Sequence, residues 1–420
     1  MKNVLIIAYQ FPPMGGSGVQ RTVKFVKYLR SFGWEPTVLT RSLKGMELRD
    51  DSLLKDIPDG VRIVRTKAYD PTTLKGVMKF PGKFIGRKIF IPDAEMLWRM
   101  TSKSAAQKLI SEGNFSLIYT TSYPYSDHLM GLHLKKLFPD IPWVADFRDE
   151  WTKNPYLLDK PHNKLRMSIE RKMEKSVLNT ADILITNTPI MLRNFLTIDD
   201  SLKSKFYVIP NGYDSEDFTK VPEKPSNDVF TLTYTGLLYG RRKPDTFFKA
   251  LSGLIGEGKV DRQTIQVNLI GNFKTEELND KINKYGLNGV VALLPYMDHN
   301  ICLDRLINSD ALLLIEGVGP GAEAFYTGKI FEYIKTGRPI LGVIPAKGAA
   351  AGIIEETRTG LVSDFNDIKG IGDKLYRLYI DWKEVRETCS PDNEKIELYD
   401  RRNLTKRLTE LFDFAVSARK

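Results

Sequence analysis

The sequence has 420 residues, more than one hydrophobic core normally organises, so we expect two or three domains. Its 42% hydrophobic and 27% charged residues are typical of a soluble globular protein, and two distant cysteines with four scattered histidines exclude a disulfide framework or a structural zinc site. The formal net charge of +10 favours anionic partners such as nucleotides, nucleic acid or acidic lipid.

The first apolar run, residues 4–9, is too short for the core of a signal peptide or for a membrane span. The cysteine usage is also that of a protein from a reducing compartment. We therefore expect a cytoplasmic protein.

Strand-like apolar runs alternate with helix-like stretches along the whole chain. In the first half the runs are 3–9, 36–40, 61–66, 116–121, 143–147, 182–187 and 206–210. In the second half they are 230–236, 265–271, 290–294, 311–315, 339–343 and 360–362. Val-, Ile- and Leu-rich strands without polar alternation are typical of parallel sheets covered by helices on both faces, so we predict two doubly wound α/β domains.

The polar segment 211–227 is the predicted linker between the two domains. The segment 401–415 places Leu404, Leu408 and Phe412 on one helical face and is predicted to pack back onto the first domain. The predicted domains are therefore 1–210 together with 401–420, and 211–400.

A glycine-rich turn, which includes Gly15 and Gly16, follows the first strand and leads into a helix. Such turns bind phosphates at the carboxyl ends of strands in open α/β sheets. A dinucleotide-binding turn is disfavoured, because Arg21 stands where the third glycine belongs and the second strand ends in Arg41 instead of an acid. A loop that closes over a ligand fits better.

The segment 71–92 combines basic and large apolar residues without a single acidic residue. Its cations are Lys75, Lys79, Lys83, Arg87 and Lys88. Docking on an anionic membrane is one interpretation, and a loop that covers part of the core is the other.

Two carboxylates and a guanidinium, Asp146, Arg148 and Asp149, come at the end of the strand 143–147. A carboxylate here could bind an acceptor hydroxyl or remove its proton, whereas an Asp–Arg pair that braces the loop is the structural alternative. His128 follows the strand 116–121 and either lines the acceptor site or serves as a structural histidine at the start of a helix.

In the second half, the strand 230–236 leads through Gly236 into the cations Arg241, Arg242 and Lys243. Guanidinium groups pair well with phosphate oxygens, so this loop predicts an anion site, with a solvated basic turn as the alternative.

The stretch 327–340 is the most informative part of the chain. Thr327, Gly328 and Lys329 open a short amphipathic helix, and Glu332 lies in its first turn. Free backbone N–H groups and a lysine favour a phosphate, and a glutamate one turn further can accept hydrogen bonds from a vicinal diol. A nucleotide-sugar contains both a diphosphate and the vicinal diol of its ribose. The structural alternative is an ordinary helix that ends at a glycine.

Four motifs in this order make the chain resemble the GT-B glycosyltransferases of family GT4, the retaining enzymes that build bacterial lipopolysaccharide, capsule and exopolysaccharide. The motifs are 11–18 (FPPMGGSG), 209–214 (IPNGYD), 236–243 (GLLYGRRK) and 328–339 (GKIFEYIKTGRP). The resemblance covers nearly the whole chain and implies two Rossmann-like domains that face each other across a cleft.

The resemblance also implies roles for the site residues. Glu332 binds the ribose, and Gly271 and Tyr296 line the base pocket. Diphosphate and phosphate contacts come from Gly15, Gly16, Gly236, Arg241, Arg242, Lys243, Thr327, Gly328 and Lys329. A bound metal is not expected, because cationic groups and helix ends neutralise the leaving diphosphate in this family.

Two departures from the family pattern concern the reacting sugar. Arg148 stands where many members have a histidine, although Asp149 is kept, and Ala324 stands where many have a glutamate that contacts the donor sugar. The histidine-dependent part of the family mechanism is therefore not carried over, and the identity of the donor sugar is left open.

The resulting hypothesis is a metal-independent retaining glycosyltransferase that moves a sugar from a UDP- or GDP-sugar to a glycan or lipid-linked acceptor in cell-surface polysaccharide synthesis. It works in the cytoplasm, with peripheral membrane contact through 71–92. The alternatives are a nucleotide-sugar epimerase of the same fold and a non-catalytic sugar-nucleotide-binding protein. A nucleic-acid-binding protein is disfavoured, because the chain has no groove-reading or base-stacking motif.

Overall fold

The computed structural model describes residues 1–45, 48–68, 90–218 and 227–418. The chain forms two compact units, the first made of Met1–Asn211 and Arg401–Lys420 and the second of Gly212–Asp400. Of the basic segment 71–92, residues 71–89 lie outside the described part of the chain. No helix among the described residues is both long and apolar enough to cross a bilayer.

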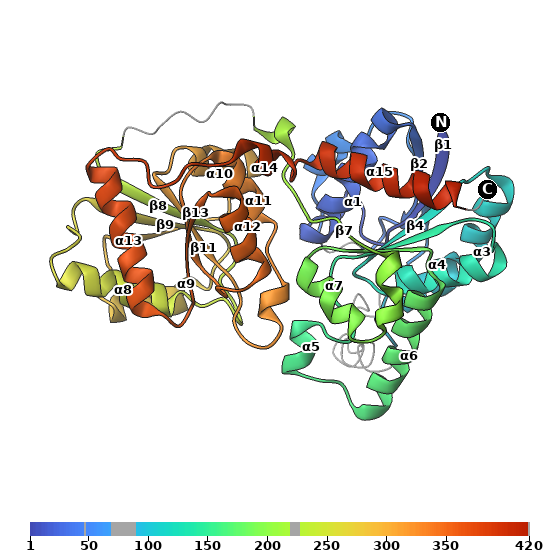
Figure 1. The fold of residues 1–420 in the computed structure, drawn as a ribbon, viewed down its shortest axis with the longest axis horizontal. Coiled ribbons are helices and arrows are strands. Elements are labelled where there is room, and N and C mark those ends of the chain that lie inside the picture. The colour runs from blue at the N-terminus through green and yellow to red at the C-terminus, as the bar shows by residue number, and fades with distance from the viewer. Residues whose placement is uncertain (46–47, 69–89, 219–226, 419–420) are drawn as a thin grey trace. The chain divides into compact units, whose positions relative to one another are not determined.

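The first unit is built on a seven-stranded parallel sheet in the order β3-β2-β1-β4-β5-β6-β7. Strands β1, β2, β4 and β7 of this sheet are labelled in Figure 1. Its strands are β1 (Lys2–Ile7), β2 (Trp34–Arg41), β3 (Arg62–Thr66), β4 (Leu117–Ser122), β5 (Trp143–Phe147), β6 (Ile183–Thr186) and β7 (Phe206–Val208). Its α-helices are α1 (Ser17–Leu29), α3 (Met96–Glu112), α4 (Ser126–Leu137), α5 (Pro155–Asp159), α6 (Lys164–Thr180), α7 (Pro189–Leu196) and α15 (Arg401–Ser417). Short 3₁₀ helices lie at η1 (Arg30–Phe32), η2 (Asp51–Asp56) and η5 (Asp200–Lys205).

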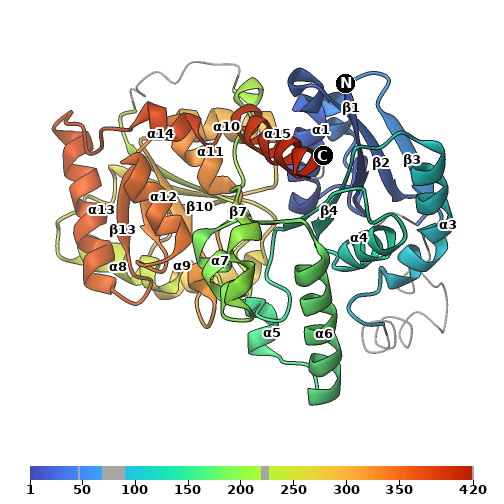
Figure 2. The same cartoon turned by 45° about the vertical axis from the view of Figure 1, so that its right-hand side comes forward.

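The C-terminal helix α15 packs beside α1 in the first unit, as the sequence predicts (Figure 2). Leu404, Leu408 and Phe412 on its apolar face are buried. The Phe412 ring contacts Trp34 and Tyr119 edge-on, at centroid distances of 5.2 and 5.7 Å. Burying these large aromatic side chains anchors the helix on the sheet, since each removes a wide apolar surface from water.

The second unit is built on a six-stranded parallel sheet in the order β10-β9-β8-β11-β12-β13. Its strands are β8 (Phe230–Thr235), β9 (Ile265–Ile270), β10 (Val291–Leu294), β11 (Ala311–Ile315), β12 (Ile340–Val343) and β13 (Gly360–Ser363). Its α-helices are α8 (Asp245–Gly256), α9 (Thr275–Lys284), α10 (His299–Ile307), α11 (Lys329–Thr336), α12 (Ala349–Thr357), α13 (Ile368–Lys383) and α14 (Asn393–Glu397). The 3₁₀ helices η6 (Ser215–Asp217) and η7 (Ala322–Ala324) also belong to this unit.

Strand β11 shows why the buried strands carry continuous apolar runs. Leu313 and Ile315 pack in one core cluster together with residues of α8 and α13. Leu312 and Leu314 pack in a second cluster with residues of α10, α11 and α12. Successive side chains of a strand point to opposite faces, so a strand covered on both sides must be apolar at every position. The predicted class of two doubly wound α/β domains is confirmed.

Each sheet has one point where the direction of strand addition reverses. In the first unit it lies between β1 and β4, and in the second between β8 and β11. Loops that leave two such neighbouring strands diverge to opposite faces, which opens a crevice at the carboxyl ends of the strands where α/β proteins bind ligands. The loops after β1, β8 and β11 carry half of the predicted site residues: Gly15, Gly16, Gly236, Arg241, Arg242, Lys243, Thr327 and Gly328.

Candidate functional site

Three predicted donor-site residues meet in the second unit at the end of β8. Gly236 follows this strand with a φ of +107°, which favours glycine. A Cβ atom on Gly236 would lie 2.8 Å from Lys329 Nζ, and a Cβ on Gly271, at the end of β9, would clash with the Gly236 carbonyl oxygen. Both glycines are therefore needed for the close approach of backbone and lysine.

Lys329 begins helix α11 and turns its ammonium into this corner. Its Nζ atom is buried and has no hydrogen-bond partner among the described residues, and it lies 3.9 Å from the centroid of the Tyr234 ring. Burial and, secondarily, the positive charge of Arg242 lower the pKa of Lys329 to about 7. A buried ammonium without a partner is unfavourable, so this position is prepared for an anion.

Glu316, which we did not predict as a site residue, lies beside this position at the end of β11. Its Oε1 accepts hydrogen bonds from the backbone N–H of Thr327 at 2.8 Å and from the Thr327 hydroxyl at 3.3 Å. Its Oε2 is buried without a partner among the described residues, and burial raises the pKa of Glu316 to about 7. An acid directly after a fully apolar strand is the sequence signal that could have identified it.

Glu332, in the first turn of α11, is paired with a residue that we did not assign. His299, the first residue of α10, places its Nε2 2.9 Å from Glu332 Oε1. The Glu332 side chain is 31% exposed, so solvent and small molecules reach it.

The three cations after β8 take different positions. Arg241 donates a hydrogen bond to the Pro320 carbonyl oxygen at 2.9 Å. The Arg242 guanidinium lies 5.8 Å from the centroid of the Tyr239 ring. Lys243 is exposed and makes no hydrogen bond or ion pair with any described residue. The loop is thus not one compact anion cradle, and Arg242 is the cation whose charge acts on Lys329.

Two other predicted donor residues are open to solvent. Tyr296, after β10, is 75% exposed, and Gly328 is exposed at the N-cap of α11. Ala324 is buried in η7, whereas the neighbouring Glu323 side chain is exposed. Neither Ala324 nor Glu323 therefore provides a buried carboxylate where many family members have the glutamate that contacts the donor sugar.

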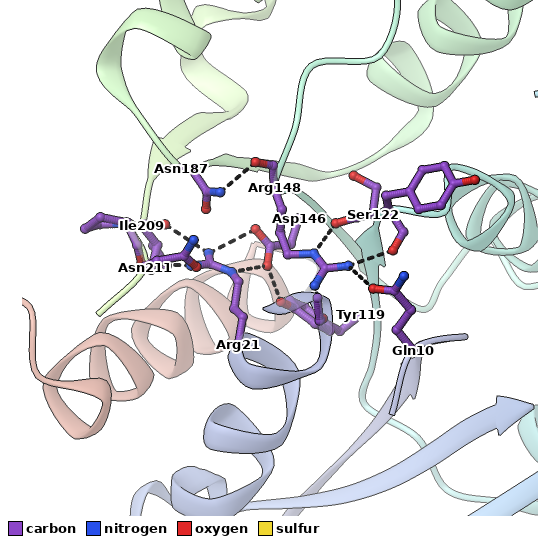
Figure 3. Close-up of polar contacts among 12 residues, drawn as sticks. Gln10, Arg21, Tyr119, Ser122, Asp146, Arg148, Asn187, Ile209 and Asn211 are labelled. Carbon is purple, nitrogen blue, oxygen red and sulfur yellow. Dashed lines mark hydrogen bonds and ion pairs between the residues drawn. The ribbon is translucent and has the colours of Figure 1, made fainter. Parts of the chain in front are cut away.

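In the first unit, Asp146 at the end of β5 is fully buried, and both of its carboxylate oxygens accept hydrogen bonds. Arg21 of α1 binds it through two hydrogen bonds, Nε to Oδ2 at 2.7 Å and Nη2 to Oδ1 at 3.0 Å, and the Tyr119 hydroxyl donates a third at 2.5 Å (Figure 3). The remaining donors of Arg21 reach the carbonyl oxygens of Ile209 and Pro210. This arrangement explains the arginine in place of a third glycine, and it makes Asp146 a positioning residue that ties α1 to β5 and to the chain after β7.

Arg148 also makes structural contacts. Its guanidinium donates hydrogen bonds to the carbonyl oxygens of Gly18, Ser122 and Tyr123, the last at 2.7 Å (Figure 3). The backbone carbonyl of Arg148 accepts a hydrogen bond from Asn187 Nδ2 at 2.6 Å. Burial lowers the pKa of the Arg148 guanidinium. Arg148 therefore joins the first turn of α1 to the loops after β4 and β5, and its remaining contact is to Gln10 Oε1 at 3.4 Å.

Asp149 differs from these two neighbours. Its carboxylate is partly buried and forms no hydrogen bond or ion pair with any described residue. Burial raises the pKa of Asp149, and the charge of Arg148 opposes that rise. Among the predicted catalytic residues of this unit, Asp149 is the one whose side chain bonds to no described residue.

His128, in the first turn of α4, is completely buried. Its Nδ1 pairs with the Thr120 hydroxyl at 2.8 Å, and its ring lies 4.3 Å from that of Phe147. Burial and then the charge of Arg148 lower the pKa of His128 to about 3, so the imidazole is neutral. Its Nδ1 thus makes a structural contact, whereas its Nε2 is buried without a hydrogen-bond partner among the described residues, and the acceptor-side role of His128 stays a prediction.

Gly15 and Gly16 shape the loop between β1 and α1. The Gly15 N–H donates to the Leu48 carbonyl oxygen at 3.1 Å, and a Cβ on Gly15 would lie 3.1 Å from Leu48 Cγ. Gly16 has a φ of +105° directly before the helix. These positions need glycine for the turn itself. Within the described residues, no group of three His, Cys, Asp or Glu side chains is arranged to hold a metal ion.

Comparisons with known proteins agree with this architecture. Residues 16–217 match the model of Glycosyltransferase Family 4. A D-inositol 3-phosphate glycosyltransferase from Nocardioides is 24% identical over 225 residues, which are 49% of this chain and 47% of that relative. The chain thus matches about half the length of this curated relative.

Similar solved structures cover the whole chain. The sucrose-phosphate synthase of Thermosynechococcus elongatus has a TM-score of 0.69 at 15% identity, with both chains covered completely. Anabaena HepE, solved with UDP and glucose, has a TM-score of 0.63 at 13% identity and covers 98% of this chain and 99% of its own. The two parallel doubly wound sheets and the structural neighbours show that the chain has the GT-B fold, and the match to the Glycosyltransferase Family 4 model lies in its first half, at residues 16–217.

Proposed function

We propose that the protein transfers a sugar from a nucleoside diphosphate sugar, linked to UDP or GDP, to a glycan or lipid-linked acceptor in cell-surface polysaccharide synthesis. The observation that carries this proposal is the buried Lys329 ammonium, which has no hydrogen-bond partner among the described residues. It lies at the switch point of the second sheet, where the glycines after β8 and β9 remove all side-chain bulk.

In this proposal, two parts of the donor molecule, its diphosphate and its ribose, bind at two different positions on helix α11. Lys329 and the N-terminus of the helix take the diphosphate, and Glu332 takes the ribose hydroxyls one turn further. Arg242 and Lys243 supply further phosphate contacts in this proposal. The neighbour solved with UDP and glucose supports UDP as the nucleotide.

The proposed reaction retains the configuration of the sugar. The acceptor hydroxyl oxygen bonds to the anomeric carbon on the face that the diphosphate leaves, the bond from that carbon to the phosphate oxygen breaks, and the hydroxyl proton passes to the leaving phosphate oxygen. Lys329 and Arg242 stabilise the charge on the departing diphosphate without a metal ion. Asp149, whose carboxylate has no partner among the described residues, orients the acceptor hydroxyl.

The proposed place of action is the cytoplasmic face of the membrane, where a lipid-linked acceptor is available. The basic and apolar composition of 71–92 supports this part of the proposal.

The test is calorimetric titration of the protein with UDP and GDP, followed by a turnover assay with the corresponding sugar nucleotides and a lipid-linked glycan acceptor. We expect one nucleoside diphosphate to bind, and Glu332→Gln to weaken that binding about ten- to a hundredfold without a shift in the thermal unfolding midpoint. Folded protein that binds neither nucleotide would contradict the proposal. Conversion of the donor without any acceptor would identify an epimerase instead.

A further inference from the structure

We propose that His299 is a positioning residue of the donor site. It holds one oxygen of the Glu332 carboxylate so that the other oxygen is presented to the ribose hydroxyls of the nucleotide. This inference rests on the proposed function, because it assumes that Glu332 binds ribose.

The geometry of the pair is that of a directed hydrogen bond. His299 Nε2 lies 2.9 Å from Glu332 Oε1 and joins the first residue of α10 to the first turn of α11. A carboxylate can only accept hydrogen bonds, so Nε2 carries the hydrogen and donates it. The side chains are 49% and 31% exposed, so the pair lies at the surface where a ligand reaches it.

The pair leaves part of the carboxylate unused. Glu332 Oε2 accepts no hydrogen bond from any described residue, whereas a carboxylate offers about four acceptor positions. A glutamate on an exposed helix face samples several rotamers, and ordering it when a ligand binds costs free energy. Because His299 orders the side chain beforehand, the ligand meets an acceptor already in place.

The same contact keeps the two binding positions on α11 separate. Lys329 lies one turn before Glu332, and its Nζ makes no hydrogen bond to any described residue. The Glu332 charge acts on this neighbourhood, since it adds to burial in raising the pKa of the Cys302 thiol to about 11. The Glu332 charge also favours the charged form of Lys329, but with Oε1 held by His299 the carboxylate makes no hydrogen bond to Lys329 Nζ, which stays available for phosphate.

The first experiment compares UDP with 2′-deoxy-UDP by calorimetry, or GDP with its 2′-deoxy form if the protein prefers guanine. In His299→Ala we expect UDP binding to weaken about tenfold and 2′-deoxy-UDP binding to weaken no more than about twofold, so that discrimination between the two sugars falls. His299→Gln, which keeps an N–H donor, should recover most of the affinity. In turnover assays the KM for the donor should rise while kcat stays within about twofold.

A double-mutant cycle separates positioning from a direct contact. If His299 acts through Glu332, the Ala substitution should change UDP affinity by less than about twofold in a Glu332→Gln background. The matched control is His162→Ala, because His162 also faces a glutamate, with Nε2 3.8 Å from Glu170 Oε1, but in the first unit.

The outcomes distinguish the inference from the proposed function. Wild-type protein that binds no nucleoside diphosphate would overturn both. Normal UDP affinity in His299→Ala, or an equal loss for both nucleotides that persists in the Glu332→Gln background, would overturn the role of His299 alone.

Discussion

The ammonium of Lys329 lies over the ring of Tyr234, with Nζ 3.9 Å from the ring centroid. A cation–π contact supplies about 0.5–2 kcal/mol, which is less than the several kcal/mol that an ammonium loses when it leaves water. The ring therefore makes the buried charge tolerable without neutralising it. A phosphate group can pair with this ammonium. Without a ligand, the buried charge lowers the stability of the folded protein.

The first prediction is that Lys329→Met stabilises the protein while it weakens UDP binding. The pKa of Lys329 is lowered to about 7 in the folded protein, so the ammonium is disfavoured there relative to the unfolded chain. The buried ammonium therefore lowers the free energy of unfolding by its full amount below about pH 7. This destabilisation diminishes as the pH rises toward the pKa of the lysine in the unfolded chain. We expect the variant to gain about 1–2 kcal/mol in the free energy of unfolding near pH 6, less near pH 9, and to bind UDP at least about tenfold more weakly.

Urea denaturation at the two pH values measures the stability term. The matched control is Lys335→Met on the same helix, since Lys335 also lies over a tyrosine ring, with Nζ 5.3 Å from the centroid of Tyr213. A Lys329→Met protein less stable than the wild type near pH 6 would show that the ammonium is not a source of strain.

The second prediction concerns the pH dependence of nucleotide binding. Lys329 loses a positive charge and Glu316 gains a negative one as pH rises through about 7, and both changes disfavour a diphosphate. UDP should bind about tenfold more tightly near pH 6 than near pH 8 and should take up protons on binding. Calorimetry in buffers of different ionisation enthalpy detects this uptake. Glu316→Gln should flatten the pH dependence, and release of protons by the wild type would refute the coupling.

The third prediction separates the two acids after β5. Asp146→Asn leaves the Arg21 guanidinium buried without a carboxylate, so we expect a loss of about 3–5 kcal/mol in the free energy of unfolding. Asp149→Asn should stay within about 1 kcal/mol of the wild type, because no described residue bonds to the Asp149 carboxylate. Its turnover should fall about a hundredfold. Comparing urea unfolding with turnover tests both, and an active Asp149→Asn enzyme would remove this residue from the mechanism.

The fourth prediction is that charge stabilisation at the diphosphate needs cations and no metal ion. Lys243 is exposed without a polar partner among the described residues, and its flexible stem allows it to move onto a bound phosphate. Lys243→Ala should reduce turnover about 10²–10³-fold, and EDTA should leave the wild type active. Full activity of the variant, or loss of wild-type activity in chelator, would disprove this arrangement.

The fifth prediction is that the segment 71–92 binds anionic membranes. Changing its cations Lys75, Lys79, Lys83, Arg87 and Lys88 to Gln should reduce co-sedimentation with anionic liposomes, since each cation contributes about 1 kcal/mol near such a surface. Wild-type binding should weaken as salt increases. Equal sedimentation of the two proteins would leave the segment with no role at the membrane.

The sequence by itself determined the architecture of this protein. The apolar run 311–315 is a buried strand, and the leucine stripe of 401–415 packs on the first unit, as their patterns predict. The glycines at 236 and 271 also stand where the backbone requires them. These features depend on hydrophobic periodicity and backbone conformation, which neighbouring residues specify locally.

The tertiary structure decided which polar groups are paired and which are left for a ligand. Asp146 and Asp149 are alike in sequence, yet only Asp146 meets Arg21, because the strand order brings α1 beside the end of β5. Glu316 and His299 join the site through partners 11 and 33 positions away along the chain. Such pairings depend on the positions of distant elements and on side-chain rotamers, which no local pattern of residues encodes.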